Sequence, residues 1–199
     1  GSRYSEPYDK LILSPGAEPL KPKIEGIDHP NVFTLRNVPD TDKIKRFVNV
    51  KKVEKAIVVG GGFIGLEMAE NLHDLGIKVE LVEMADQVMA HLDYSMATII
   101  HSELRAKGVT LHLSDAVEKF GDAPNGVSVH LKSGSTITAE MVVFSIGVRP
   151  ETKLARESGL ELGKSGGIKT NEYMQTSNPD IYALGDAAEV THSVLGTPA

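Results

Sequence analysis

The 199-residue chain is long enough for one large domain or for one domain with attachments, and its hydrophobic content of 41% is ordinary for a protein with a buried core. A formal net charge of -6 excludes a strongly basic surface, so neither nucleic acid nor an anionic membrane is expected as a partner. The chain has no cysteine, no signal-peptide pattern and no apolar stretch long enough to span a bilayer, which favours a cytoplasmic setting. Residues 1–2, Gly-Ser, resemble the remnant of a cleaved tag, so we expect an excised piece.

The first predicted elements are a buried strand over 8–13, a loop rich in proline and glycine over 14–19, and a helix over 38–49. Asp40 or Thr41 is the expected N-cap of that helix. An apolar strand over 56–59 then runs into a glycine-rich turn, which a helix ending at Gly76 and a strand over 78–83 follow. This order predicts a βαβ unit.

The turn has the pattern G-x-G-x-x-G, in the sequence Gly60-Gly61-Gly62-Phe63-Ile64-Gly65. Gly60 permits a tight turn, Gly62 allows close approach to a pyrophosphate, and Gly65 lets the helix lie near the sheet. The first amides of the helix would meet the phosphate charge. The alternative, a glycine-rich turn that only tightens a strand–helix joint, is disfavoured because the preceding strand, the following helix and a carboxylate at the next strand end all agree.

That carboxylate is Glu83, eighteen residues beyond Gly65. It is placed to accept hydrogen bonds from a ribose diol, and its charge would repel a 2′-phosphate. No lysine or arginine follows within 84–89 to hold such a phosphate. The sequence therefore predicts NADH rather than NADPH as the cofactor.

A helix is predicted over 94–107, with Asp93 as its cap and Gly108 as its end. Its expected apolar positions are Met96, Ile99, Ile100 and Leu104. Strands with a period of two follow over 109–113, 116–120, 127–131 and 141–146, which predicts a β-meander crossing over the parallel sheet before its last strand rejoins it. Extended segments are expected from 166 and over 180–184. The histidines 73, 101, 112 and 130 show no metal-ligand spacing, so no metal site is predicted.

Four blocks in order resemble the FAD-dependent pyridine nucleotide-disulfide oxidoreductases: 11–17 (LILSPGA), 60–67 (GGGFIGLE), 145–150 (SIGVRP) and 176–186 (TSNPDIYALGD). Within that family, the residues of these blocks are most similar to the branch that contains coenzyme A-disulfide reductases, persulfide reductases and NADH oxidases. The fold that the resemblance implies is α/β: a Rossmann-like parallel sheet with a β-meander crossover, as in the NAD domain of glutathione reductase, flanked by remnant strands of an FAD domain.

The resemblance also implies roles for single residues. Phe63 matches an aromatic gate over the nicotinamide, Glu67 a carboxylate near the nicotinamide and flavin rings, and Gly147 a close backbone approach to the nicotinamide. Core packing for Phe63 and a helix-dipole charge for Glu67 are the alternatives. The matches to the flavin site of the whole protein are Gly16, Gly185, Asp186 and Ala187, although Gly185-Asp186 could also be only a turn and helix cap.

The domain assignment that follows is an FAD-domain remnant over 1–37, an NAD(H)-binding domain over 38–165 and a second FAD-domain remnant over 166–199. The strands over 8–13 and 181–184 are expected to pair with each other, and their open edge favours self-association. The whole protein is expected to be a homodimeric flavoenzyme with a dimerisation domain.

The expected function is NADH binding for an FAD-dependent disulfide or persulfide reductase. The family's FAD fingerprint and redox cysteine are missing, so no catalytic residue is assigned and the chain alone is expected to be inactive and free of FAD. An NADH oxidase, peroxidase or ferredoxin reductase parent, and a non-catalytic NADH-sensing module, remain alternatives.

Overall fold

A computed structural model describes residues 4–194 and 196–198, so residues 1–2, interpreted as a tag remnant, lie outside the described part. The chain forms two compact units. The larger is Pro19–Gly147, and the smaller combines the described residues of Gly1–Glu18 and Val148–Ala199. Each unit has its own buried core.

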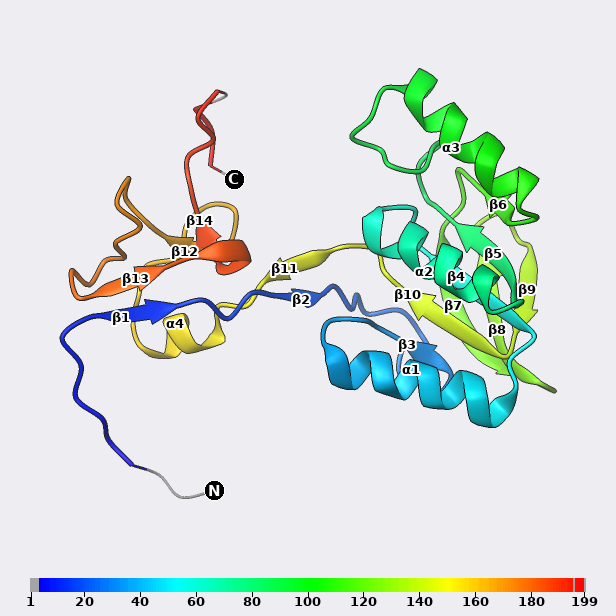
Figure 1. Cartoon of the computed structure of the whole chain (residues 1–199), viewed down its shortest axis with the longest axis horizontal. Helices are drawn as coiled ribbons and strands as arrows, with labels where there is room; N and C mark the ends of the chain where they lie inside the picture. The colour runs from blue at the N-terminus through cyan, green and yellow to red at the C-terminus, as the bar shows by residue number, and fades with distance from the viewer. Residues whose placement is uncertain (1–3, 195, 199) are drawn as a thin grey trace. The chain divides into compact units, whose positions relative to one another are not determined.

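The larger unit is built on a five-stranded parallel sheet in the order β3-β10-β4-β5-β6 (Figure 1). Its strands are β3 (Val32–Phe33), β4 (Lys55–Val59), β5 (Lys78–Val82), β6 (Thr110–His112) and β10 (Met141–Phe144). All of β10 and all but the first residue of β4 are buried. Such continuous apolar runs are typical of strands that are covered on both faces.

Three helices cover one face of this sheet: α1 (Val38–Lys51), α2 (Phe63–Asp74) and α3 (Tyr94–Ala106). The predicted N-cap of α1 is wrong. Asn37 caps the helix by accepting from the backbone N–H of Asp40, whose own side chain accepts from the backbone N–H of Asn37. This reciprocal capping box satisfies two otherwise unpaired donors, and it places the N-cap three residues before Asp40.

The predicted apolar face of α3 is also partly wrong. Met96 and Ile99 are exposed, whereas Ala97, His101 and Leu104 are buried. These three residues follow the spacing of one helix face. The prediction placed the large apolar side chains on the buried face, whereas a small residue and a histidine occupy core positions there.

An antiparallel meander covers the opposite face of the sheet, with strands β7 (Val117–Ala123), β8 (Gly126–Leu131) and β9 (Thr136–Ala139). Phe120 of β7 packs edge-on against Phe144 of β10, with ring centroids 5.9 Å apart, inside the core between these two layers. The prediction that the strand at 109–113 belongs to the meander is wrong. This strand is β6, which pairs with β5 in the parallel sheet. The alternation of apolar and polar residues identifies a strand but does not determine which neighbouring strand it pairs with.

The smaller unit contains three short strand pairs. The parallel pair of β1 (Leu11–Leu13) and β13 (Ile181–Ala183) confirms the predicted pairing. Parallel β12 (Ile168–Lys169) and β14 (Ala188–Glu189) form the second pair, and β2 (Ala17–Pro19) with β11 (Val148–Pro150) the third. Helix α4 (Lys153–Glu157) and the 3-10 helix η1 (Gly185–Ala187) complete the unit.

The α/β class, the parallel sheet and the meander confirm the predicted fold class. Residues 19–37 belong to the larger unit because β3 pairs with β10. Compact units and nucleotide-binding domains need not share boundaries, so the domain limits at 38 and 165 remain a proposal. Within the described ranges, no helix combines the length and apolarity that crossing a membrane would require.

Candidate functional site

The glycine-rich turn joins β4 to α2 at the carboxyl end of the parallel sheet. Gly60 has φ +106°, and a Cβ built there would overlap the carbonyl oxygen of Ser145, which follows β10. A Cβ at Gly65 would overlap the carbonyl oxygen of Gly60. Both positions therefore need glycine for close packing of the strand end, the turn and the helix, as predicted from the motif.

Gly62 differs from these two glycines because a Cβ built there has no atom within 4 Å. It is the N-cap of α2 and offers no side-chain acceptor to the helix. The first helical bond runs from the N–H of Leu66 to the carbonyl oxygen of Gly62 at 3.0 Å, so the amides before Leu66 are the unpaired N-terminal donors of α2. Open space in front of such donors, at the positive end of a helix, fits a pyrophosphate.

Glu83 follows β5 and reaches back to the turn. Its Oε2 accepts from the backbone N–H of Gly61 at 2.6 Å, and its Oε1 accepts from the backbone N–H of Ala85 at 2.8 Å. Each carboxylate oxygen keeps a further lone pair for an outside donor. The structure thus brings Glu83 and the turn together, in the arrangement that a ribose next to a pyrophosphate would need.

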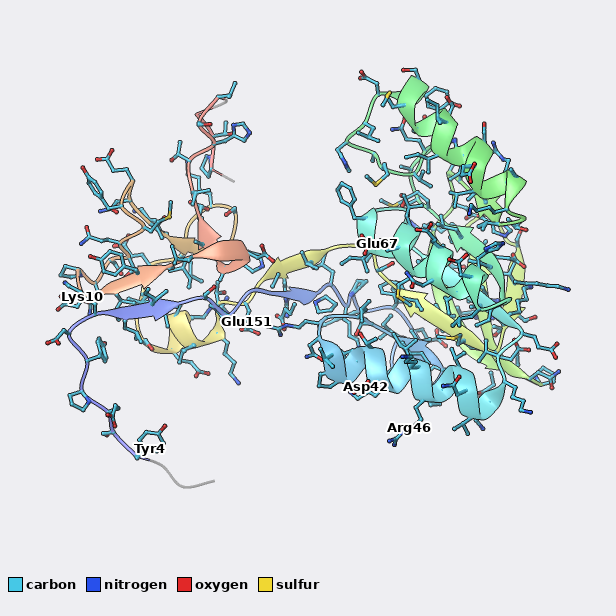
Figure 2. The ribbon with its side chains drawn as sticks, in the orientation of Figure 1. Tyr4, Lys10, Asp42, Arg46, Glu67 and Glu151 are labelled. Atoms are coloured by element: carbon cyan, nitrogen blue, oxygen red, sulfur yellow. The ribbon has the colours of Figure 1, made fainter. Side chains whose placement is uncertain are left out.

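Phe63 and Glu67 both lie exposed on α2, and Figure 2 labels Glu67. Phe63 is 64% exposed, and its ring contacts that of His91 in a tilted arrangement with the centroids 5.1 Å apart. Core packing is therefore ruled out for Phe63 in this chain. Since α2 begins at Phe63, Glu67 lies beyond the first turn, where the helix dipole is already weak, so the dipole explanation is wrong as well. Ile64 occupies the first turn of α2.

Gly147 lies at the same end of the sheet, three residues after β10. It has φ +128°, and its carbonyl oxygen accepts from the backbone N–H of Leu20 at 3.0 Å. Ser145 links the two strand ends, because its hydroxyl donates to the carbonyl oxygen of Val59 at 3.0 Å. All of the residues predicted to bind NADH therefore belong to the larger unit and lie at or next to the carboxyl ends of β4, β5 and β10.

Sequence reasoning missed the support beneath the turn. Val88 is fully buried and lies against Gly61, and the backbone N–H of Met89 donates to the carbonyl oxygen of Gly61 at 2.8 Å. The backbone N–H of Val88 in turn donates to Nε2 of His101 at 3.1 Å. One sequence signal was available for His101, its position four residues after Ala97 and three before Leu104 on one helix face. Val88 and Met89 carry no comparable signal.

A charged cluster lies farther back on the strands. Glu80 of β5 contacts Nζ of Lys55 at 2.5 Å and Nε2 of His112 at 2.6 Å. Burial by itself raises the pKa of Glu80, but the hydrogen bonds from Lys55 and His112 lower it below its ordinary value overall. In the part of the chain that the structure describes, no group of three or more His, Cys, Asp or Glu side chains is arranged to hold a metal ion.

The residues matched to a flavin site belong to the smaller unit, at the carboxyl ends of β1 and β13. The backbone N–H of Leu184 donates to the carbonyl oxygen of Leu13 at 3.0 Å, which brings the Gly16 loop beside η1. A Cβ at Gly185 would lie 3.4 Å from Oγ of Ser14, and Asp186 is exposed while Ala187 is buried. An exposed carboxylate beside two parallel strand ends suits a polyhydroxyl ligand.

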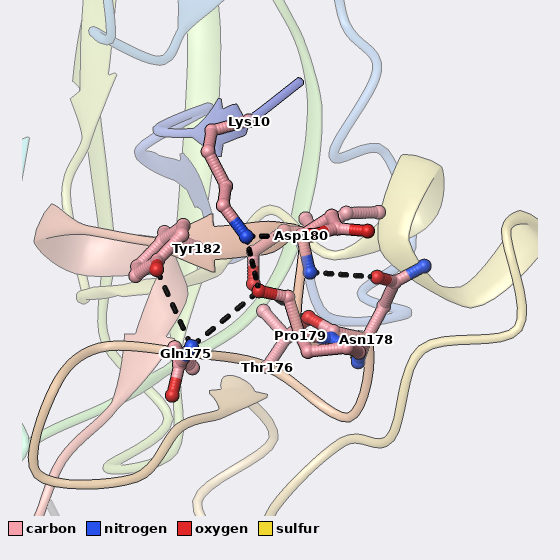
Figure 3. A network of polar contacts seen from close by, with 8 residues as sticks. Lys10, Gln175, Thr176, Asn178, Pro179, Asp180 and Tyr182 are labelled. Atoms are coloured by element: carbon pink, nitrogen blue, oxygen red, sulfur yellow. Dashed lines mark hydrogen bonds and ion pairs between the residues drawn. The ribbon is translucent and has the colours of Figure 1, made fainter. Parts of the chain in front are cut away.

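Lys10 forms an ion pair at the amino-terminal ends of β1 and β13. Figure 3 shows its Nζ between Asp180 and Pro179, at 2.5 Å from Oδ1 of Asp180 and 3.2 Å from the carbonyl oxygen of Pro179. Gln175 donates to the same carbonyl oxygen at 3.4 Å and to the hydroxyl of Tyr182 at 3.3 Å. Lys10 therefore joins the residue before β1 to the residue before β13, while Gln175 contacts the β13 side.

Comparison with known proteins gives close relatives. The chain is 40% identical over 197 residues to an NADH oxidase of Methanocaldococcus jannaschii, with 98% of this chain and 44% of the relative covered. It is 34% identical to the coenzyme A disulfide reductase of Staphylococcus aureus, with 99% and 43% covered. The chain therefore spans less than half the length of the curated relatives it matches.

Solved structures agree. Reduced CoADR-RHD of Bacillus anthracis is 51% identical with a TM-score of 0.94, and the match covers 98% of this chain and 35% of that one. The water-forming NADH oxidase of Lactobacillus brevis, solved with NADH bound, is 32% identical with a TM-score of 0.89, covering 98% and 42%. An engineered NADPH oxidase derived from it was solved with NADPH.

A sequence model of one family matches residues 1–197. The turn, the sheet with its meander and these relatives lead to the same result. The chain belongs to the pyridine nucleotide-disulphide oxidoreductase family.

Proposed function

We propose that the larger unit binds NADH across the carboxyl ends of β4, β5 and β10. The observation that carries the proposal is the carboxylate of Glu83, which both Gly61 and Ala85 hold beside the open backbone at Gly62. The pyrophosphate would lie over Gly62 at the N-terminus of α2, and the adenosine ribose would donate its hydroxyls to Glu83.

The proposal includes a preference for NADH over NADPH. The negative charge of Glu83 opposes a 2′-phosphate, and the segment 84–89 has no lysine or arginine that could neutralise one. In the engineered oxidase bound to NADPH, the substitutions replace a glycine and the aspartate eighteen positions after it by alanine. Glu83 follows Gly65 by the same interval, which supports Glu83 as the position that discriminates the two cofactors.

We further propose that the NADH site serves a whole protein of the disulfide or persulfide reductase type. NADH when bound supplies a hydride, which in such a protein is delivered to flavin. Phe63, Glu67 and Gly147 would surround the nicotinamide, and Gly16, Gly185, Asp186 and Ala187 would contact FAD once the rest of the FAD domain is present. The chain itself has no cysteine and is proposed to be inactive alone. A homodimeric parent with a dimerisation domain is part of the same proposal.

Titration calorimetry with NADH and NADPH tests the proposal. The unchanged chain should bind NADH at least about tenfold more tightly than NADPH, a difference of about 1.4 kcal/mol. Glu83→Ala should narrow that ratio. Glu83→Gln keeps one acceptor for Gly61 while removing the charge. It should also reduce the ratio of NADH to NADPH affinity, with a smaller loss of NADH affinity than in Glu83→Ala. Glu118→Ala, an exposed carboxylate on β7, is the matched control and should leave the ratio unchanged.

Equal affinity of the unchanged chain for both cofactors would refute the role given to Glu83. The proposed inactivity has a separate test, because a preparation with flavin absorbance that oxidises NADH would contradict it. An oxidase parent, favoured by the relative from Methanocaldococcus jannaschii, differs from a disulfide reductase parent in the final acceptor. Turnover of the full-length protein with oxygen or with coenzyme A disulfide distinguishes these two candidates.

A further inference from the structure

The segment between β5 and α3 supports the glycine-rich turn from below. The Gly61 peptide is held at both ends: its N–H donates to Glu83 at 2.6 Å, and its carbonyl oxygen accepts from the N–H of Met89 at 2.8 Å. Val88 fills the space beside Gly61, because a Cβ at Gly61 would lie 2.9 Å from Cγ1 of Val88. The position of Gly61 therefore depends on the backbone at 88–89.

That backbone has a conformation that needs support. Met89 has φ +52°, in the left-handed region that L-residues with a side chain rarely adopt. Nε2 of Gln87 donates to the carbonyl oxygens of Met89 at 3.4 Å and Leu92 at 2.8 Å. Outside the segment itself, His101 of α3 accepts from the N–H of Val88 at 3.1 Å. This contact joins the segment to a rigid helix.

His101 can make this contact only when it is neutral. Nε2 is the acceptor, so the proton of the neutral ring is on Nδ1, and a protonated imidazole would have no acceptor left. His101 is 3% exposed, and its ring lies edge-to-face with that of Tyr94, with the centroids 6.4 Å apart. Burial, followed by the positive charge of Arg105 on α3, lowers the pKa of His101, whereas Asp86 in the segment opposes the shift.

We propose that His101 is a positioning residue for NADH binding: its neutral ring holds Val88 and Met89 against Gly61, and its protonation releases them and weakens NADH binding. This inference rests on the proposed NADH site. Because the pKa is lower in the supported state than in a released segment, support is complete above the ordinary histidine pKa of about 6.5. It is lost as the pH falls through the lower value.

The test is the dissociation constant for NADH between about pH 5 and pH 8 for the whole chain and three variants. The unchanged chain should lose about tenfold in affinity toward the acid end. His101→Gln keeps an acceptor near the Nε2 position but does not titrate, so it should bind nearly as tightly as the unchanged chain at pH 8 and show a flat profile. His101→Leu leaves the N–H of Val88 unpaired and should bind about tenfold more weakly at pH 8, also with a flat profile.

His91→Gln is the matched control, because His91 is an exposed histidine in contact with Phe63. It should retain the acid loss of affinity. If His101 had a purely structural role, its substitution would change the stability of the chain. The pH dependence of NADH affinity would then be the same in the unchanged chain and in His101→Gln. An acid loss that persists in His101→Gln, or one that disappears in His91→Gln, would overturn the inference and leave the NADH site intact. No NADH binding by the unchanged chain at pH 8 would overturn both proposals.

Discussion

Two glycines of the turn should respond to alanine in opposite ways. At Gly60 the backbone has φ +106° and an added methyl group would overlap the carbonyl oxygen of Ser145, so Gly60→Ala acts on the fold. At Gly62 the backbone has φ -81° and ψ -173°, which alanine adopts freely, and the space around an added methyl group is open. Apart from a small loss at the N-cap of α2, Gly62→Ala therefore acts where the pyrophosphate is proposed to lie.

The magnitudes follow from these geometries. A left-handed conformation costs an L-residue about 1–2 kcal/mol. Overpacking against fixed backbone adds about 1–3 kcal/mol, so Gly60→Ala should lower the free energy of unfolding by about 2–5 kcal/mol. For a chain of this size that corresponds to a fall in Tm of about 4–20 °C. Gly62→Ala changes an N-cap residue and should lower the free energy of unfolding by at most about 1 kcal/mol, while NADH affinity falls at least about tenfold.

Thermal unfolding followed by circular dichroism measures the first effect, and NADH titration measures the second. NADH affinity is measured for Gly62→Ala at a temperature at which the variant is fully folded. If Gly62→Ala bound NADH as tightly as the unchanged chain, no pyrophosphate would lie against this backbone. If Gly60→Ala melted at the unchanged temperature, the turn would be free to move away from Ser145, contrary to the packing described above.

The capping box and the half-buried cluster around Glu80 give two further predictions. Asn37→Ala removes an N-cap and should lower the free energy of unfolding by about 1 kcal/mol in urea titrations, whereas exposed Asn49→Ala on the same helix should change it by less than about 0.5 kcal/mol. Glu80 has a lower pKa in the folded chain than in the unfolded chain, despite burial that opposes the shift, because Lys55 and His112 donate to it. Its stabilising effect is present above the unfolded pKa and is lost as the pH falls, so Glu80→Gln should flatten the decline in stability below about pH 5. An unchanged acid decline in this variant would contradict that assignment.

Sequence reasoning predicted best the elements with a long and clear period. Helices α2 and α3 and strands β4 and β5 appear where the apolar patterns and glycine signals placed them, within a few residues. The pair β2–β11 was missed because each of these strands contains a charged residue and a proline, which are uncommon in strands. The N-cap of α1 was misassigned because Asp40 and Thr41 are also good capping residues, and only the position of Pro39 in the first turn points back to Asn37.

The part of the candidate site that belongs to the glycine motif could be predicted from the sequence. The spacing from Gly65 to Glu83 predicts a carboxylate beside the glycine-rich turn, and in the structure Glu83 accepts from the backbone N–H of Gly61 in that turn. The contact between Val88 and His101 has no such pattern, because it joins a loop backbone to a side chain thirteen residues later. Only the buried face of α3 marked His101, and the larger apolar side chains of Met96 and Ile99 obscured it.

The two hydrogen bonds on the Gly61 peptide also bear on the thermodynamics of binding. Fixing the backbone of a free residue costs about 1–2 kcal/mol in conformational entropy, which a ligand that orders a loose loop must offset from its own contacts. Glu83 and Met89 hold the Gly61 backbone through hydrogen bonds that the chain makes with itself. The turn is therefore preorganised, so the contacts that NADH makes with its amides contribute to affinity instead of ordering the backbone.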